Sequence, residues 1–277
     1  MDIRNIKVEE YTGLNHLEFI FEKGKEQLEK YMGIEKLPMY PIDINTKKSQ
    51  IILKDFIGRV VEELAEGYES LQLASDILDK YGWNIQNMPK DDYVEVLNNL
   101  ANANEEQADA MGFFVTLLLY ANILPEDIAS YKGSDTSSLN HLMAHGVSII
   151  WDGDQYKEPR GYNLLDTDLL SEYGLDYDKI INYTPGFTSI SPAKLEQTVA
   201  HLWKITYQLN LARNFLKNRP WKQSPVMSKE LDFQETLVKA FYSYLGYLAY
   251  NDYEEKSITN LFYRKQQLNL WRIKTGY

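Results

Sequence analysis

The sequence predicts an all-α protein in which two pseudo-repeated helical units form a helix bundle, with an insert between them. Apolar residues recur at intervals of three and four through most of the 277 residues, which is the period of a helix with one buried face. The exception lies within 126–194, where β-branched and aromatic residues mix with Gly, Pro and Asp. We expect this insert to be mostly irregular or a short hairpin. The helical units are then 1–125 and 195–277.

Three helices are expected in the first unit, over residues 14–32, 48–80 and 92–122. Pro38 follows the first of them and Gly82 follows the second, and both residue types commonly occur where a helix ends.

The second unit has the same outline. Helical periodicity returns after Pro192, a loop is expected over 218–225, and a helix follows over 232–250. A final helix carries the sequence to the C-terminus. The sequences of the two units can be aligned with Leu64 on Leu209. In this alignment each unit is a helix, a loop and a second helix, which suggests a duplicated unit.

Composition restricts the classes of function. The chain has no cysteine, so thiolate metal sites and a cysteine nucleophile are excluded. A formal net charge of −11 argues against general nucleic-acid binding. No run of 18 apolar residues and no signal peptide are present, so we expect no membrane span and a cytoplasmic location.

Two acidic clusters stand out on predicted helices. Glu63 and Glu66 are three residues apart, as are Glu106 and Asp109, so each pair shares a helix face. Apolar neighbours at helical spacing place the acids beside the buried stripe, where carboxylates need a cation or a proton. Oxygen ligands favour Mg²⁺, Mn²⁺ or Ca²⁺ over zinc. In the other interpretation, the acids are solvated and pair with helix neighbours such as Lys54 or Arg59.

The C-terminal helix carries a polar stripe of Lys265, Asn269 and Arg272, spaced four and three residues apart. A guanidinium and an ammonium group on one face suit phosphate oxygens. The alternative is a solvated basic turn that is favourable to the helix dipole.

These motifs together resemble the all-α nucleoside triphosphate pyrophosphatases, the MazG-like superfamily. The paired acids match its metal motif, and the tail is similar to the closing motif of dimeric dUTPases and of phage dCTP/dUTP pyrophosphatases. That tail comprises Tyr263, Lys265, Asn269, Arg272, Gly276 and Tyr277. The sequence departs from the family at Gly112, where a His is common, and at Thr236 and Lys239, where the helix before the tail carries acids in relatives.

The resemblance implies a Mg²⁺-dependent enzyme that hydrolyses a pyrimidine deoxynucleoside triphosphate, dUTP before dCTP or a modified pyrimidine, to the monophosphate and pyrophosphate. It implies a homodimer, in the host cytoplasm if a phage encodes it. Glu63 would activate water and, with Glu66, Glu106 and Asp109, bind metal. The residues expected to bind phosphate are Lys265, Asn269, Arg272 and Tyr277, and those expected to bind the base are Gln27 and Trp221. The alternative is an inactive relative that binds nucleotide or a protein partner. It stays open whether the tail of the second unit reaches the acids of the first.

Overall fold

The computed structural model describes residues 9–131, 138–150, 161–218 and 227–276, and its described part is mostly helical with almost no strand. The all-α prediction is therefore confirmed. The long helices are α1 (His16–Glu35), α2 (Lys47–Lys80), α3 (Lys90–Tyr120), α8 (Pro192–Phe215), α9 (Glu230–Tyr250) and α10 (Glu255–Thr275). The shorter elements are η2 (Ile85–Asn87), α4 (Pro125–Ser130), α5 (Leu139–Ile150), β1 (Tyr162–Asn163), α6 (Thr167–Glu172), α7 (Tyr177–Tyr183) and β2 (Ser189–Ile190).

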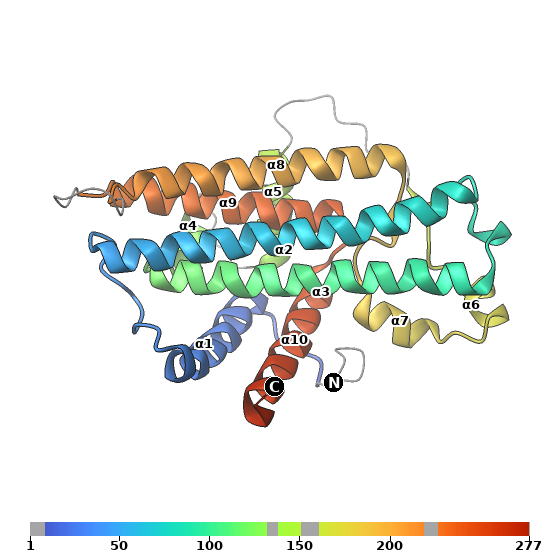
Figure 1. Cartoon of the computed structure of the whole chain (residues 1–277), viewed down its shortest axis with the longest axis horizontal. Coiled ribbons are helices and arrows are strands. Elements are labelled where there is room, and N and C mark those ends of the chain that lie inside the picture. Colours follow the sequence, from blue (N-terminus) through green and yellow to red (C-terminus); the bar gives the residue numbers. More distant parts are fainter. Residues whose placement is uncertain (1–8, 132–137, 151–160, 219–226, 277) are drawn as a thin grey trace.

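Four long helices lie side by side along the length of the molecule (Figure 1). They form two antiparallel pairs, α2 with α3 and α8 with α9, and α2 also packs against α8. Each predicted unit contributes one pair. That the two pairs descend from one duplicated unit stays a prediction.

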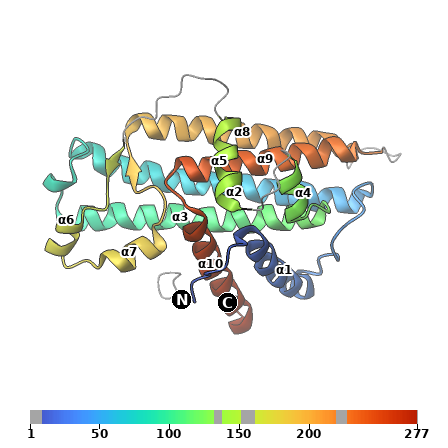
Figure 2. The ribbon, with the colours of Figure 1, turned by 180° about the vertical axis from the view of Figure 1, so that it is seen from behind.

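Two further helices project from one side of this bundle. Helices α1 and α10 pack against each other and against α3, and both described ends of the chain lie on this side (Figures 1 and 2). The first and last long helices of the chain therefore meet at the middle of α3.

Local sequence explains where the long helices begin. The Thr46 side chain caps α2 by accepting a hydrogen bond from the backbone N–H of Ser49. This N–H lies in the first turn and has no acceptor within the helix. Ser191 caps α8 in the same way through the N–H of Lys194, and Pro192 occupies the first turn, where its missing N–H is not needed. Helix α9 is buried on nearly all sides, because α5 and α8 cover it.

The segment between the units is more helical than predicted. Helix α5 continues to Ile150, through residues where the sequence had lost a helical period. A Cβ on Gly146 would lie 2.2 Å from the carbonyl oxygen of Tyr242 and 2.4 Å from the backbone nitrogen of Gly246. The two glycines let α5 and α9 approach closely, and this contact stabilises a helix that the local sequence does not favour.

The expected hairpin in this segment is also wrong. Strands β1 and β2 pair antiparallel, with Tyr162 opposite Ile190, but helices α6 and α7 lie between them in the chain. Among the described helices, none has both the length and the apolar character that crossing a membrane requires.

Candidate functional site

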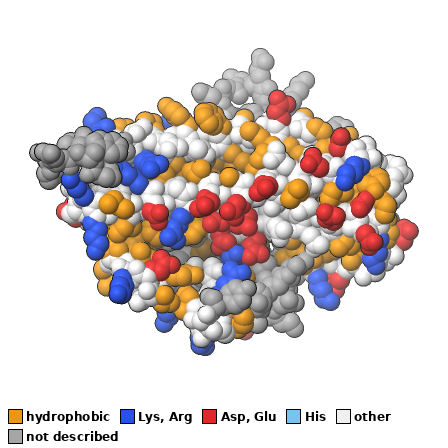
Figure 3. All heavy atoms as spheres, in the orientation of Figure 1, with side chains coloured by type: hydrophobic (Ala, Val, Ile, Leu, Met, Phe, Trp, Pro, Cys, Tyr) orange, Lys and Arg blue, Asp and Glu red, His pale blue; other side chains and the backbone are white. Residues whose placement is uncertain are grey.

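Three of the four predicted acids meet at the middle of the α2–α3 pair. Glu63 on α2 and Glu106 and Asp109 on α3 each offer a carboxylate oxygen, and these atoms lie within 4.8 Å of one another. Val60 and Leu64 are buried on either side of Glu63, so the packing of α2 against α3 determines where its side chain points. Figure 3 shows acidic side chains gathered at the centre of this face of the molecule.

The three carboxyl groups are too close to be ionised together without compensation. Burial, a hydrogen bond with Glu106 and the charge of Asp109 raise the pKa of Glu63 to about 9. Burial also raises the pKa of Glu106 and that of Asp109. Like charges in a poorly solvated site favour the protonated form, so the cluster binds either a proton or a cation.

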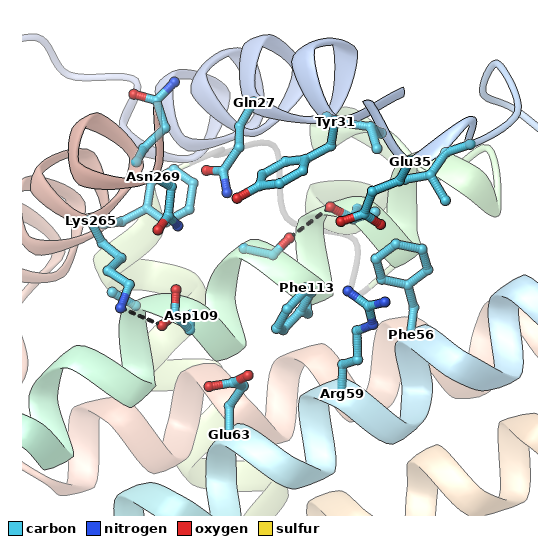
Figure 4. A pocket seen from close by; sticks show the side chains of 17 residues that line it. Gln27, Tyr31, Glu35, Phe56, Arg59, Glu63, Asp109, Phe113, Lys265 and Asn269 are labelled. Carbon is cyan, nitrogen blue, oxygen red and sulfur yellow. Dashed lines mark hydrogen bonds and ion pairs between the residues drawn. The ribbon is translucent and has the colours of Figure 1, made fainter. Parts of the chain in front are cut away.

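Lys265 brings one positive charge to the acids from the C-terminal helix. Its Nζ lies 2.6 Å from Oδ2 of Asp109 and also donates to Glu105. The Lys265 side chain is 7% exposed, and Asn269, one turn further along α10, makes a side-chain hydrogen bond to Asp109. The tail of the second unit therefore does reach the acids of the first unit (Figure 4).

The donor set suits a divalent metal ion. Carboxylate oxygens are the ligands that Mg²⁺ and Mn²⁺ take in proteins. Glu63 and Glu106 share a hydrogen bond, an arrangement that requires one of them to be protonated and that a bound cation would replace. Lys265 forms ion pairs with Asp109 and Glu105, and its charge also acts on Glu106. One ammonium group does not balance these carboxylates and Glu63, so negative charge remains for a metal to neutralise.

A cavity of about 210 Å³ opens beside the acids. Figure 4 shows that α1 forms one wall and that α2, α3 and α10 form the others. Its lining combines acids, cations, amides and aromatic rings. The polar and aromatic residues of the lining are Gln27, Tyr31, Glu35, Phe56, Arg59, Glu63, Asp109, Phe113, Thr116, Phe262, Lys265, Gln266 and Asn269.

The predicted ligand residues divide into several groups. Gln27, Lys265 and Asn269 line the cavity, whereas Arg272 does not and reaches the Asn269 side chain at 3.5 Å. Glu66 is exposed on α2 and is not part of the group of three acids, although its charge acts on Glu63. The expectations for Trp221 and Tyr277 lie outside the described residues.

Some cavity residues were missed from the sequence. Tyr31 lies one turn beyond Gln27 on α1, Arg59 one turn before Glu63 on α2, and Phe113 one turn beyond Asp109 on α3. That four-residue spacing was a usable signal, since such neighbours share a helix face. Gly112, where relatives have a His, also lines the cavity, and a Cβ there would meet only Phe262.

The alternative pairing of the acids with Arg59 is wrong for the described residues. Arg59 pairs with Asp55, and Lys54 donates to the carbonyl oxygen of Asn218.

Neither protein-family models, nor curated proteins, nor solved structures match this chain. The chemical interpretation of the site therefore depends on its own residues.

Proposed function

We propose that the protein hydrolyses a pyrimidine deoxynucleoside triphosphate in the presence of Mg²⁺, giving the monophosphate and pyrophosphate. One observation carries the proposal: three carboxylates from α2 and α3 converge, and two of them, Glu63 and Asp109, line a cavity that also offers aromatic and amide groups. A triphosphate needs a cation for its phosphates and an enclosed surface for its base. The substrate we place first is dUTP, followed by dCTP or a modified pyrimidine nucleotide.

Glu63, Glu106 and Asp109 would hold the metal ion, with Mn²⁺ as a substitute, and Glu66 is the proposed fourth ligand. When bound, the ion polarises phosphoryl oxygens and lowers the pKa of a coordinated water. Burial and neighbouring acids hold a proton on the Glu63–Glu106 pair, and a cation would displace that proton. Glu63 is then a carboxylate that can accept a proton from water attacking the α-phosphorus.

The part of the cavity farther from the acids suits a small base. The Gln27 amide points into it beside the Tyr31 ring (Figure 4), and an amide can both donate to and accept from the edge of a pyrimidine. Phe113 adds an apolar surface on the other side.

The deciding experiment is a substrate panel. The purified protein is incubated with each deoxynucleoside triphosphate and Mg²⁺, and pyrophosphate release is measured. We expect release from dUTP or dCTP, and none after chelation of the metal. Absence of release from every pyrimidine nucleotide contradicts the proposed activity.

The fourth metal ligand is tested by Glu66→Ala, with Glu69→Ala as a matched control because Glu69 is also exposed on α2. Loss of turnover in the first variant alone places Glu66 in the metal site. Turnover equal to the wild type limits the protein ligands to the group of three acids.

The second candidate function is that of a nucleotide-binding or protein-interaction module without turnover. It is favoured by the ion pairs of Lys265 with Asp109 and Glu105, because a built-in ammonium group can stabilise acids without a metal. Binding of a nucleotide with no pyrophosphate release would identify this function. The homodimer stays a prediction, and its test is the mass of the protein in solution.

A further inference from the structure

We propose that Arg59, rather than Lys265, is the principal phosphate-binding residue of the cavity. The inference rests on the proposed function and adds to it the residue that recognises the polyphosphate. Among the described residues that line the cavity, Arg59 and Lys265 are the two that carry a permanent positive charge. They lie on opposite sides of Glu63 in the view of Figure 4.

The Lys265 ammonium group is already committed to protein ligands. It makes ion pairs with Asp109 and Glu105 while its side chain is almost fully buried. An ammonium group has three N–H donors, and carboxylates already take two of them. A phosphate could gain more than the third only by breaking a buried ion pair, which is strongly unfavourable. Lys265 therefore neutralises and positions the acids, and another group must hold the anionic end of a ligand.

Unlike the Lys265 ammonium group, the Arg59 guanidinium is available to bind a phosphate. Its Nε lies 3.0 Å from Oδ2 of Asp55, one turn away on α2, and both side chains are substantially exposed, at 38% and 58%. An exposed pair of this kind contributes about 1 kcal/mol or less. Within the described part of the chain, the two Nη groups of Arg59 make no hydrogen bond. Glu35 also lines the cavity, but it forms no ion pair with Arg59.

Two aromatic rings hold the guanidinium in place. Its Cζ lies 5.3 Å from the ring centroid of Phe56 and 5.6 Å from that of Phe113. Stacking of this kind limits the conformations of a long side chain before any ligand binds, so less entropy is lost when it does. Arg59 also precedes Glu63 by one helical turn, and both line the cavity, so a phosphate bound by its Nη groups would lie in the cavity that Glu63 and Asp109 share.

The chemistry of the group matches a polyphosphate. A guanidinium presents parallel N–H donors that bind two phosphate oxygens at once, and the charge assistance makes these bonds stronger than neutral ones. The two rings lie beside the Arg59 guanidinium, and its Nη groups are left for the ligand because only Nε bonds to Asp55. Arg59 is thus suited to bind phosphate, a role that the sequence predicted for the C-terminal tail.

Binding of α,β-imido-dUTP and α,β-imido-dCTP tests this inference, because the imido bond prevents hydrolysis. Affinity is measured calorimetrically with Mg²⁺ present for the wild type, Arg59→Gln, Arg59→Lys and the control Arg213→Gln. Arg213 is an exposed arginine on α8 that does not line the cavity. We expect Arg59→Gln to weaken binding by roughly 10- to 100-fold, Arg59→Lys to restore part of it and Arg213→Gln to match the wild type.

Deoxyuridine and deoxycytidine, which carry no phosphate, are the second arm. For each nucleoside that the wild type binds, the affinity of Arg59→Gln should equal that of the wild type. The thermal unfolding of Arg59→Gln should also match that of the wild type. Equal affinity of wild type and Arg59→Gln for the imido analogues overturns the inference and leaves the proposed function standing. An equal loss for nucleoside and triphosphate also overturns it, because Arg59 would then hold the base. A wild type that binds neither analogue contradicts the proposed function as well.

Discussion

The two antiparallel helix pairs differ in what surrounds them. The α2–α3 pair brings Glu63, Glu106 and Asp109 together, and Glu63 and Asp109 line a cavity that α1 and α10 cover from the side. In the alignment of the units, Gln208, Thr236 and Lys239 stand at the corresponding positions of the α8–α9 pair. Gln208 is buried, Thr236 is half-buried and Lys239 is exposed. These three side chains therefore differ widely in burial, whereas the three acids meet at one point.

The contrast shows that a helix pair becomes a site through its neighbours as much as through its own residues. Helix α5 covers α9 by direct backbone contact at Gly146 and Gly246, which leaves no room for a ligand there. Helices α1 and α10 also pack against α3, but a cavity remains between them and the α2–α3 pair.

The largest expected difference between the pairs is catalytic. Glu63→Gln keeps the shape of the side chain but removes the proton acceptor, and it should lower turnover by about 100-fold or more. The matched change in the other pair, Glu235→Gln, alters an exposed acid of α9 and should leave turnover unchanged. Initial rates of pyrophosphate release measure both variants, and equal rates would remove Glu63 from the mechanism.

The next expected effect is acid sensitivity in the α8–α9 pair. Burial against Tyr250 lowers the pKa of His201 to about 4, below that of the unfolded chain. The unfolded state then binds the proton more readily, so this contribution to stability is complete above pH 6.5 and is lost as the pH falls toward 4. The loss reaches about 3 kcal/mol.

Urea unfolding at a series of pH values measures this contribution. His201→Gln, which cannot titrate, should flatten the dependence between pH 6.5 and 4. An unchanged slope in that variant would mean that other groups cause the acid sensitivity.

Close helix approach gives the third difference. Gly146→Ala puts a methyl group 2.2 Å from a backbone oxygen of α9, and backbone atoms cannot move aside cheaply. We expect a loss of about 2 kcal/mol in the free energy of unfolding. Gly58→Ala on α2 is the control, because a Cβ there meets no atom within 4 Å, and it should raise stability by roughly 0.5 kcal/mol.

The smallest expected effect concerns metal and pH in the α2–α3 pair. The pKa of Glu63 is raised to about 9, so the unfolded state holds fewer protons and stability falls as the pH rises from about 4.5 to 9. Mg²⁺ should offset this loss by roughly 1 kcal/mol at ten times its Kd. Thermal unfolding with and without Mg²⁺ should show a shift at pH 8 and none at pH 5, and a shift of the same size at both values contradicts the metal site.

The extents of the long helices could be predicted from the sequence. The acidic pair of Glu106 and Asp109 and the cation Lys265 could be found as well, because helical spacing and residue type are local properties. The partner of Lys265 could not be predicted, since it depends on α10 folding back from the second unit onto α3.

Local sequence also left the orientation of neighbouring acids undetermined. Glu63 and Glu66 are equivalent in spacing and type, yet the packing of Val60 and Leu64 turns Glu63 toward α3 and leaves Glu66 in solvent. Arg59 and Tyr31 become neighbours of the acids for the same reason, through contacts between helices distant in the chain. The sequence alone specified the helices and the chemical groups they carry. Tertiary packing selected which of those groups share a cavity, because a helix has many faces and only its neighbours determine which one is covered.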